Sequence, residues 1–268
     1  MTATQSTQPA ERSFADRLLR ILDVFDVGRS RMPLSEISRR SGLPLATTHR
    51  MVAKLAAWGA LERGDDGLYH IGLRLWEVAM LAPRGLGLRE AAMPFLEDLY
   101  EATHENVHLA VLDGTDTVYI ERIFGRSAVG VLSRPGARWP LHATGVGLVL
   151  LAHSDPALQE AVCAGPLRGF TERTITDPAH LRGMLAEVRR TDCAVSDRQI
   201  TMDAVSVAAP IRGERGTVVA AVGLVVHVGI PPHTLVPVVR LAARGISHAL
   251  RLPPRESRVV SEWGSSRD

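Results

Sequence analysis

The stretch LSEISRRSGLPLATTHRMVAKL, residues 34–55, contains two short amphipathic segments separated by a Gly-Leu-Pro corner. The first segment, residues 34–41, is predicted to be a helix, and Gly42 behind it is a residue that commonly takes the left-handed conformation at a helix C-terminus. Proline is tolerated in the first turn of a helix, so a further helix is expected to begin at Pro44. The stretch therefore predicts two helices joined by a tight turn.

The second of these helices has two different faces. Its inner stripe, with the spacing i, i+3, i+4 and i+7, consists of Thr48, Met51, Val52 and Leu55. The opposite face carries Ala46, Thr47, His49, Arg50, Ala53 and Lys54. Small residues near the helix start let the backbone approach a partner closely, and the side chains that follow supply hydrogen-bond donors.

The flanking sequence completes a small domain. An apolar stripe predicts a helix over residues 14–25 that ends before Gly28. LERGDDGLYHI, residues 61–71, contains two strand-like runs around Gly-Asp-Asp-Gly, a pattern typical of a β-hairpin. Three helices followed by a hairpin predict a winged helix-turn-helix domain over residues 14–72.

A helix-turn-helix places the N-terminal half of its second helix in the major groove of DNA, where arginine binds guanine through two hydrogen bonds. Lysine, threonine and backbone N–H groups hold phosphates. The residues expected to contact DNA are Ala46, Thr47, His49, Arg50 and Lys54, together with Arg63 of the hairpin at a phosphate or the adjacent minor groove. A winged helix that binds only proteins is an alternative.

The composition is that of an ordinary soluble protein, with 46% hydrophobic residues, 22% charged residues and a formal net charge of +2 over 268 residues. This net charge gives no overall basic signal, so binding of nucleic acid would have to depend on a local basic patch. Cys163 and Cys193 have neither metal-binding nor disulfide-framework spacing, which favours a reducing compartment. Residues 1–13 are expected to be a disordered lead-in, and no apolar run predicts a membrane span. We expect a cytoplasmic protein.

The rest of the chain predicts a second domain. LRLWEVAML is amphipathic and is followed by proline and glycines, so a linker helix is expected over residues 73–86. Beyond it, expected helices alternate with strand-like runs at residues 107–114, 117–123, 129–133, 206–212 and 217–228. This mixture predicts an α+β sensor-like domain over residues 87–252. A flexible tail is expected over residues 253–268.

Two motifs suggest a competing function. His104-Glu105-Asn106-Val107-His108 matches HExxH, which binds zinc only when both histidines lie on one helix. Its second half is strand-like, so no metal site is expected. His142, Asp197 and Ser206 are the residue types of a hydrolase triad, but the GxSxG sequence is absent. A metal-dependent or Ser/His hydrolase with an accessory winged helix is thus the alternative to a protein that is not an enzyme and needs no cofactor.

Several motifs, in one order, resemble the IclR-type bacterial transcription regulators. They are LSEISRRSGLPLATTHRMVAKL with its hairpin, ENVHLAVLDG at 105–114, RPGARWPLHATGVG at 134–147, and TITDP at 174–178 followed by the AAPI hairpin. The resemblance covers residues 14–252. It implies a winged-helix DNA-binding domain, a linker helix and a GAF-like effector domain. It also implies homodimers that assemble into tetramers on double-stranded operator DNA.

The resemblance further implies a small-molecule effector pocket in the second domain. The ligand positions of the family fall on Gly145, Val146, Ser196, Asp197, Ser206, Gly223 and Val225. At the last two positions some relatives have serine, so this pocket floor is expected to be more apolar. That difference favours an effector with an aromatic or alkyl part.

Leu148 stands where the family often has lysine or arginine, so a carboxylate has to be held in another way. A helix is expected to begin near Ala143 or Thr144, and its free N–H groups and dipole attract anions, which Gly145 and Gly147 allow to approach closely. The sequence therefore predicts a regulator of a catabolic operon that responds to a small organic acid, with aromatic acids among the candidates.

Overall fold

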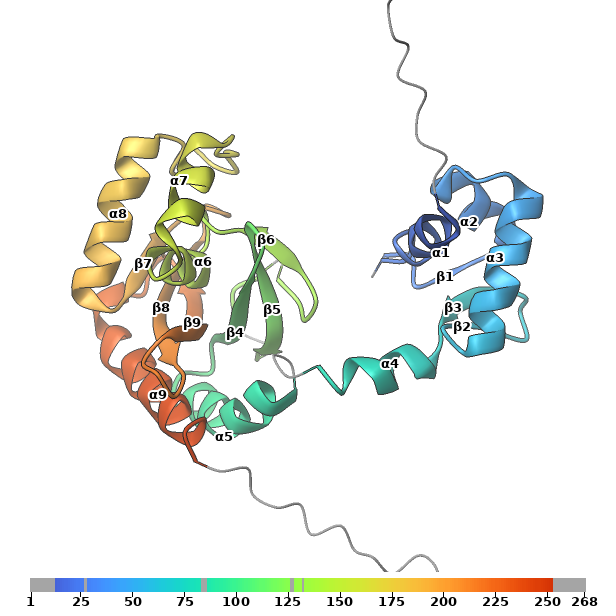
Figure 1. Cartoon of the computed structure of the whole chain (residues 1–268). Coiled ribbons are helices and arrows are strands. Elements are labelled where there is room, and N and C mark those ends of the chain that lie inside the picture. The colour runs from blue at the N-terminus through green and yellow to red at the C-terminus, as the bar shows by residue number, and fades with distance from the viewer. Residues whose placement is uncertain (1–12, 27, 83–85, 126–127, 132, 253–268) are drawn as a thin grey trace, which may run out of the picture. The chain divides into compact units, whose positions relative to one another are not determined.

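The computed structural model describes residues 13–252, apart from residues 27, 83–85, 126–127 and 132. The chain divides into two compact units, Met1–Ala82 and Pro83–Asp268, and each is described by itself (Figure 1). Residues 1–12 of the predicted lead-in and the predicted tail over 253–268 lie outside the described residues. Within the described part, each helix is too short or too polar to cross a lipid bilayer.

The first unit is a winged helix-turn-helix. Its helices are α1 (Phe14–Leu22), α2 (Leu34–Ser41), α3 (Leu45–Trp58) and α4 (Leu73–Ala79), and its strands are β1 (Arg31–Met32), β2 (Leu61–Arg63) and β3 (Tyr69–Ile71). The three strands are antiparallel in the order β1-β3-β2. The predicted hairpin is confirmed, and β1 adds a short strand that the sequence analysis did not predict.

The turn between α2 and α3 is set by local chemistry. Gly42 has φ of 64°, the left-handed conformation predicted for it. Pro44 caps the N-terminus of α3 rather than lying in its first turn. The buried hydroxyl of Thr48 donates to the carbonyl oxygens of Leu43, at 3.3 Å, and Pro44, at 3.2 Å. These bonds fix the direction in which α3 leaves the turn.

The core of this unit lies under α3. The four residues predicted for its inner stripe are all buried, and they pack against Ile21 of α1 and Ile37 of α2. Helix α1 ends at Leu22, earlier than predicted. The backbone N–H of Phe25 donates to the carbonyl of Leu22 at 3.2 Å in a turn, so the end of the apolar stripe is not helical.

The second unit is built on one six-stranded antiparallel sheet with the order β6-β5-β4-β9-β8-β7. The strands are β4 (Asn106–Asp113), β5 (Asp116–Ile123), β6 (Arg138–Pro140), β7 (Ala194–Asp197), β8 (Ala204–Arg212) and β9 (Val218–His227). The late hairpin β8–β9 and the pair β4–β5 agree with the predicted strands. The two units together confirm the predicted α+β fold class.

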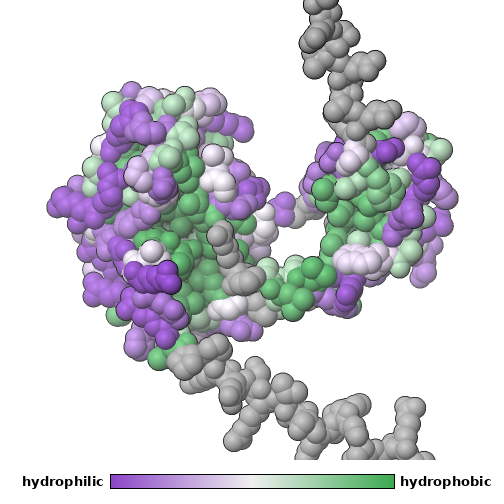
Figure 2. Space-filling model, in the orientation of Figure 1, coloured by the Kyte–Doolittle hydropathy of each residue, from purple (hydrophilic) through white to green (hydrophobic). Residues whose placement is uncertain are grey.

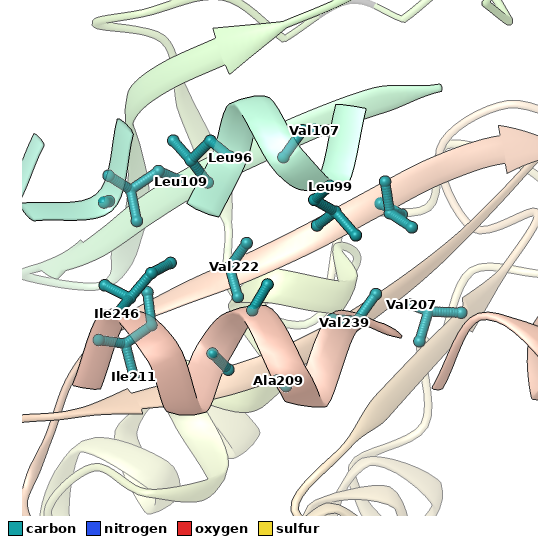
Figure 3. Packing of buried hydrophobic residues seen from close by; sticks show 14 of the residues in the cluster. Leu96, Leu99, Val107, Leu109, Val207, Ala209, Ile211, Val222, Val239 and Ile246 are labelled. Atoms are coloured by element: carbon teal, nitrogen blue, oxygen red, sulfur yellow. The ribbon is translucent and has the colours of Figure 1, made fainter. Parts of the chain in front are cut away.

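Helices cover both faces of this sheet (Figure 1). They are α5 (Leu86–Thr103), α6 (Gly145–Ala152), α7 (Pro156–Ala164), α8 (Pro178–Thr191) and α9 (Val236–Ala249), with a 3-10 turn, η1, at Pro232–Thr234. On one face, side chains of α5 and α9, such as Leu96 and Ile246, interdigitate with sheet residues such as Val107 and Val222 (Figure 3). On the other face, α6 is buried along its whole length between the sheet and α8.

Two segments of this unit differ from the prediction. The run at residues 129–133 does not form a strand among its described residues, because β5 pairs instead with β6. Side chains of the sheet hold the run: Asn106 Nδ2 donates to Val129 O at 2.8 Å and Arg122 Nη1 to Ser133 O at 2.8 Å. Helix α7 was not predicted, although Asp155 and Pro156 supply an N-terminal cap and a suitable first residue.

Candidate functional site

Helix α3 presents the predicted DNA-binding residues on one surface. Ala46, His49, Arg50 and Lys54 are exposed, and Thr47 is half-buried. The helix contains no acidic residue, and neither His49 nor Arg50 forms an ion pair within the described residues. The outer surface of α3 is therefore available to a polyanion, with a positive charge and hydrogen-bond donors in its N-terminal half.

Two other predicted DNA contacts are held by neighbouring aromatic rings. Lys54 Nζ lies 5.9 Å from the ring centre of Phe14 on α1, at the C-terminal side of the α3 surface. Arg63 is exposed on β2, where its guanidinium lies 5.7 Å from the Tyr69 ring and Nε donates to Gly67 O at 3.4 Å. Both cations are positioned by the fold while their charges stay accessible.

The second unit contains a cavity between the sheet and the start of α6. It encloses about 600 Å³ of space free of protein atoms, part of which is open to solvent. Six of the seven predicted effector positions line it: Gly145, Val146, Ser196, Ser206, Gly223 and Val225. A cavity with a mainly apolar lining and a few polar groups is typical of small-molecule sites. Residues from β7, β8, β9 and α6, far apart in sequence, are thus brought to one place.

Two glycines are required for the shape of this cavity. A Cβ atom on Gly145 would lie 2.6 Å from Ser206 Oγ. A Cβ atom on Gly223 would lie 3.0 Å from Val146 Cγ1 and 3.2 Å from Val207 O. Because real contacts of Cβ atoms are longer, larger residues at these positions would push α6 and the sheet apart or fill the cavity.

The N-terminus of α6 is only partly free to bind an anion. Thr144 caps the helix and accepts the N–H of Gly147 at 3.0 Å, while the N–H of Gly145 donates to Ser206 Oγ at 3.2 Å. In the described part of the chain, the N–H of Val146 has no hydrogen-bond partner. The expectation that Gly147 admits an anion is not met: a Cβ atom there would lie 2.5 Å from Leu141 O, so this glycine serves backbone packing.

Asp197 requires a correction, because it does not line the cavity. Successive side chains of a strand point to opposite faces, and on β7 the buried hydroxyl of Ser196 points inward and donates to Ala143 O at 3.2 Å. Asp197 instead pairs with Arg198 at 2.8 Å and Arg173 at 3.5 Å. The hydrogen bond from Arg198 keeps the pKa of this carboxyl below its usual value.

Several lining residues were not predicted as effector contacts. They are His108 from β4, Tyr119 from β5, Ser133 from the run after β5, Trp139 from β6, Thr144, and Gln199, Ile200 and Thr201 after β7. His108 had been noted only as part of the HExxH sequence. Its alternation with the apolar residues Val107 and Leu109, which belong to the opposite face, is a signal that could have identified it.

The cavity is electrically neutral. Among the described residues that line it, no side chain carries a formal charge. Burial, and next the nearby Arg122 guanidinium, lower the pKa of His108 to about 3, so this imidazole is neutral at physiological pH. Burial raises the pKa of Tyr119, so its phenol keeps its proton. An anion bound here would be held by neutral donors and by the α6 dipole.

The residues of the alternative hydrolase are not brought together as a triad. His142 Nε2 hydrogen-bonds Arg168 O at 3.0 Å, Ser206 accepts from Gly145, and Asp197 pairs with arginines. In the HExxH sequence, α5 ends at Thr103 and β4 begins at Asn106, so His104 lies in the junction between them, His108 lies on β4, and the two histidines do not share a helix. No cluster of three metal-binding side chains occurs among the described residues.

Both units of the chain match families of known proteins. Residues 15–65 match the model of the IclR helix-turn-helix domain, and residues 81–248 match that of the bacterial transcriptional regulator IclR C-terminal domain. The chain is 31% identical to the HTH-type transcriptional regulator XynR of Escherichia coli over 78% of its length and 84% of that protein. It is 33% identical to BhcR of Paracoccus denitrificans over 78% of its length and 75% of that regulator.

A solved structure is similar over nearly the whole chain. It is that of an IclR homologue from Microbacterium hydrocarbonoxydans in complex with 4-hydroxybenzoate, with 38% identity and a TM-score of 0.86, covering 89% of this chain and 99% of that one. The members of this family are transcription regulators that combine a DNA-binding domain with an effector domain, and not enzymes. The chain therefore belongs to the IclR family of bacterial transcription regulators.

Proposed function

We propose that this regulator controls a catabolic operon in response to a small aromatic carboxylate. The observation that carries the proposal is a cavity with apolar walls, formed by Trp139, Val146, Ile200 and Val225 among others, at the N-terminus of a buried helix. Such walls suit a flat ring better than a small, strongly hydrated acid. A structurally similar IclR homologue binds 4-hydroxybenzoate, which supports the same class of effector.

The carboxylate would bind at the start of α6. Two donors are in place there: the N–H of Val146, and the hydroxyl of Ser206, whose oxygen already accepts from Gly145 and whose proton remains to be donated. The positive end of the helix dipole adds to them. Asp197 pairs with arginines outside this lining, so it would not repel the anion directly.

This effector class is tested by calorimetric titration of the full-length protein with benzoate and with pyruvate, an acid without a ring. We expect benzoate to bind with a dissociation constant of about 1–100 μM, which is about −5 to −8 kcal/mol, and pyruvate to bind at least about tenfold more weakly. Tighter binding of pyruvate than of benzoate would contradict the proposal, because apolar walls would then contribute nothing.

For operator binding, we propose that α3 lies in the major groove with Arg50 at a guanine. Thr47 and Lys54 would contact phosphates, and the Arg63 hairpin would lie over the adjacent backbone or minor groove. The small residue Ala46 and the donor His49 would lie close to the bases. The exposure of these residues on an α3 surface without carboxylates supports this arrangement.

We also propose that the protein is a cytoplasmic homodimer that assembles into a tetramer on its operator. The first unit exposes large apolar side chains that a lone domain does not need: Leu73 is 63% exposed, Trp76 60% and Leu81 80%, on and just after α4, and Leu19 on α1 is 58% exposed. Figure 2 shows hydrophobic residues on the surface of this region. Exposed patches of this kind mark protein interfaces.

Replacing Trp76 with glutamate is expected to shift the protein towards monomers. The substitution places a charge in the proposed contact, where desolvating it costs several kcal/mol. Light scattering at low micromolar concentration should show a smaller mass than for the native protein. The matched control is Trp139→Glu, in the effector cavity, which should leave the mass unchanged. An unchanged mass for Trp76→Glu would remove α4 from the dimer interface.

A further inference from the structure

The second unit contains a groove lined by arginines, apart from the effector cavity. It lies where the C-terminal end of α8, strand β8 and helix α9 come together (Figure 1). Among the described residues, the linings of the groove and of the effector cavity share no member. The charged residues that line the groove are six arginines and one aspartate: Arg189, Arg190, Arg212, Arg240, Arg244, Arg251 and Asp192. The groove is therefore strongly basic, although the net charge of the whole chain is only +2.

Two of these arginines are neutralised by carboxylates of the protein. Arg190 Nη2 lies 2.6 Å from Glu187 Oε1, and Arg212 Nη2 lies 2.8 Å from Asp192 Oδ1. Asp192 is the one carboxylate among the described residues that line the groove. The other guanidinium groups of the groove therefore hold positive charges that the described side chains do not offset.

Two of the remaining arginines are held in place by neutral groups. Arg189 Nη1 donates to Ala152 O at 3.3 Å and to Gln159 Oε1 at 3.1 Å. Arg240 Nη2 of α9 donates to the carbonyl of Thr191 at the end of α8. A guanidinium group has five N–H donors, so both side chains keep further donors that no described residue accepts. These contacts fix the two cations in position without neutralising them.

Helix α9 places basic side chains in a row along the groove. Arg240, Arg244 and His248 follow one another at intervals of four residues, so they lie on one face of the helix over about 12 Å. Arg244 is exposed and has no side-chain hydrogen bond or ion pair within the described residues. A helix dipole attracts cations to the last turn. Arg240 and Arg244 precede that turn, so the dipole does not account for them.

A ligand with several linked phosphate groups suits this row of cations. The planar guanidinium group binds phosphate oxygens through two parallel hydrogen bonds. A row of about 12 Å is longer than one phosphate group can contact, whereas a chain of phosphates can reach several arginines at once. Cations gathered in one place also repel one another, and a bound polyanion would remove that repulsion.

The rest of the lining argues against a protein segment as the ligand. The apolar residues of the groove are the small Ala209, Pro210 and Ala243, and its described lining includes no phenylalanine, tyrosine or tryptophan. Protein interfaces are enriched in aromatic side chains, and nucleobases stack on them. The chain's own end, residues 253–268, contains three arginines and three acidic residues, so it supplies no excess of negative charge. The phosphates themselves are therefore the group that the groove recognises.

We propose that this arginine groove is a second ligand site, which binds an oligophosphate: the phosphate chain of a nucleoside triphosphate or a free polyphosphate. Arg189, Arg240 and Arg244 bind its phosphate oxygens, and Asp192 limits the affinity by its negative charge. The inference goes beyond the aromatic effector proposed above and does not depend on it, because the two linings share no described residue.

The test is a calorimetric titration of the full-length protein with tripolyphosphate, orthophosphate and a hexaglutamate peptide, at equal ionic strength and without divalent cations. We expect tripolyphosphate to bind with a dissociation constant of about 1–100 μM and orthophosphate at least about tenfold more weakly. A further titration with ATP distinguishes the two sources of the phosphates. Binding at least as tight as that of tripolyphosphate supports a nucleotide, and weaker binding supports a free polyphosphate.

Variants of two groove residues should change tripolyphosphate affinity in opposite directions. Arg244→Ala should lower it about tenfold or more, and Arg244→Lys, which keeps the charge but loses the planar fork, should lower it less. Asp192→Asn should raise it about threefold or more, because the carboxylate of the groove is removed. Asp192 has a φ of 48°, a conformation that asparagine also adopts, so this variant is expected to fold.

Two control variants locate the anion. Arg134→Ala removes an exposed arginine of the second unit that forms no ion pair within the described residues and does not line the groove. Arg50→Ala removes a cation from the DNA-binding surface of α3. Both variants should bind tripolyphosphate as the native protein does, and Arg244→Ala should bind operator DNA as the native protein does.

Four results would contradict the proposal. The first is a native protein that does not bind tripolyphosphate, and the second is native affinity in Arg244→Ala. The third is tighter binding of hexaglutamate than of tripolyphosphate, which would make the groove a docking site for an acidic protein segment. The fourth is a fall in operator affinity in Arg244→Ala, which would assign the groove to DNA. Each of these results leaves the aromatic effector class untouched, since that class is tested with benzoate and pyruvate.

Discussion

Gly145→Val is expected to lower effector affinity about 100-fold or more, which is about 2.7 kcal/mol, while operator affinity without effector stays unchanged. Already the first added carbon would lie 2.6 Å from Ser206 Oγ, 3.4 Å from Ser206 Cβ and 3.5 Å from Ala208 Cβ. The serine would have to rotate away, which breaks its bond with the Gly145 N–H. The two remaining carbons of valine would fill the position proposed for the carboxylate. Overpacking of this kind commonly costs about 1–3 kcal/mol on its own.

Titration calorimetry with an aromatic acid that the native protein binds measures this effect. The matched control is Gly183→Val on α8, where an added Cβ atom would meet no neighbour within 4 Å. A thermal melt and the operator affinity verify that each variant is folded. Should Gly145→Val bind the acid normally while remaining folded, the start of α6 is not the carboxylate site. Gly145→Ala provides a graded check, with a smaller loss expected because the extra carbons are absent.

Arg50→Ala is expected to weaken operator binding by about 1–3 kcal/mol and to relax the base preference at one position of each half-site. The guanidinium is exposed on the outer surface of α3 and forms no ion pair within the described residues. It is therefore free to bind a guanine through two hydrogen bonds. Lys54→Ala should have a different effect, because a phosphate contact does not depend on base sequence. Affinity should fall equally for all DNA sequences, and the slope of log affinity against log salt concentration should decrease by about one.

A gel-shift titration against the native operator and against single-base variants distinguishes these two effects. The control for loss of charge is Arg182→Ala, an exposed arginine of the second unit that pairs with Glu160 at 2.8 Å. It should bind operator as the native protein does. Unchanged affinity and unchanged base preference for Arg50→Ala would remove Arg50 from the residues that contact bases.

The helix-turn-helix could be predicted from sequence because its determinants are local. The left-handed Gly42, the inner stripe of α3 and the hairpin turn each depend on residues within a few positions of one another. The end of α1 was predicted too late because an apolar residue at position 25 continues the stripe beyond the helix, where it packs against the core from a turn. Periodicity marks buried residues, and not all of them are helical.

The cavity was predicted less completely because it is assembled from segments distant in sequence. The resemblance to the family located six of its residues. Which side chains of β7 point into the cavity, Ser196 rather than Asp197, depends on how β7 pairs with β8. His108 and Ser133 meet only because β5 pairs with residues 138–140 and leaves the run before them to be held by side chains. Neither fact is present in a local pattern.

The central claim is that an aromatic acid and operator DNA are linked through this protein. A ligand shifts DNA binding only if its affinity differs between the DNA-bound and free protein, and coupling of about 1–3 kcal/mol, or 5–150-fold, is typical. The most direct measurement is operator affinity by fluorescence anisotropy with and without saturating 4-hydroxybenzoate, on DNA fragments retained by the purified protein. The account predicts a shift of that size, matched by an equal shift in acid affinity when operator is present. Equal operator affinity with and without bound acid would contradict it.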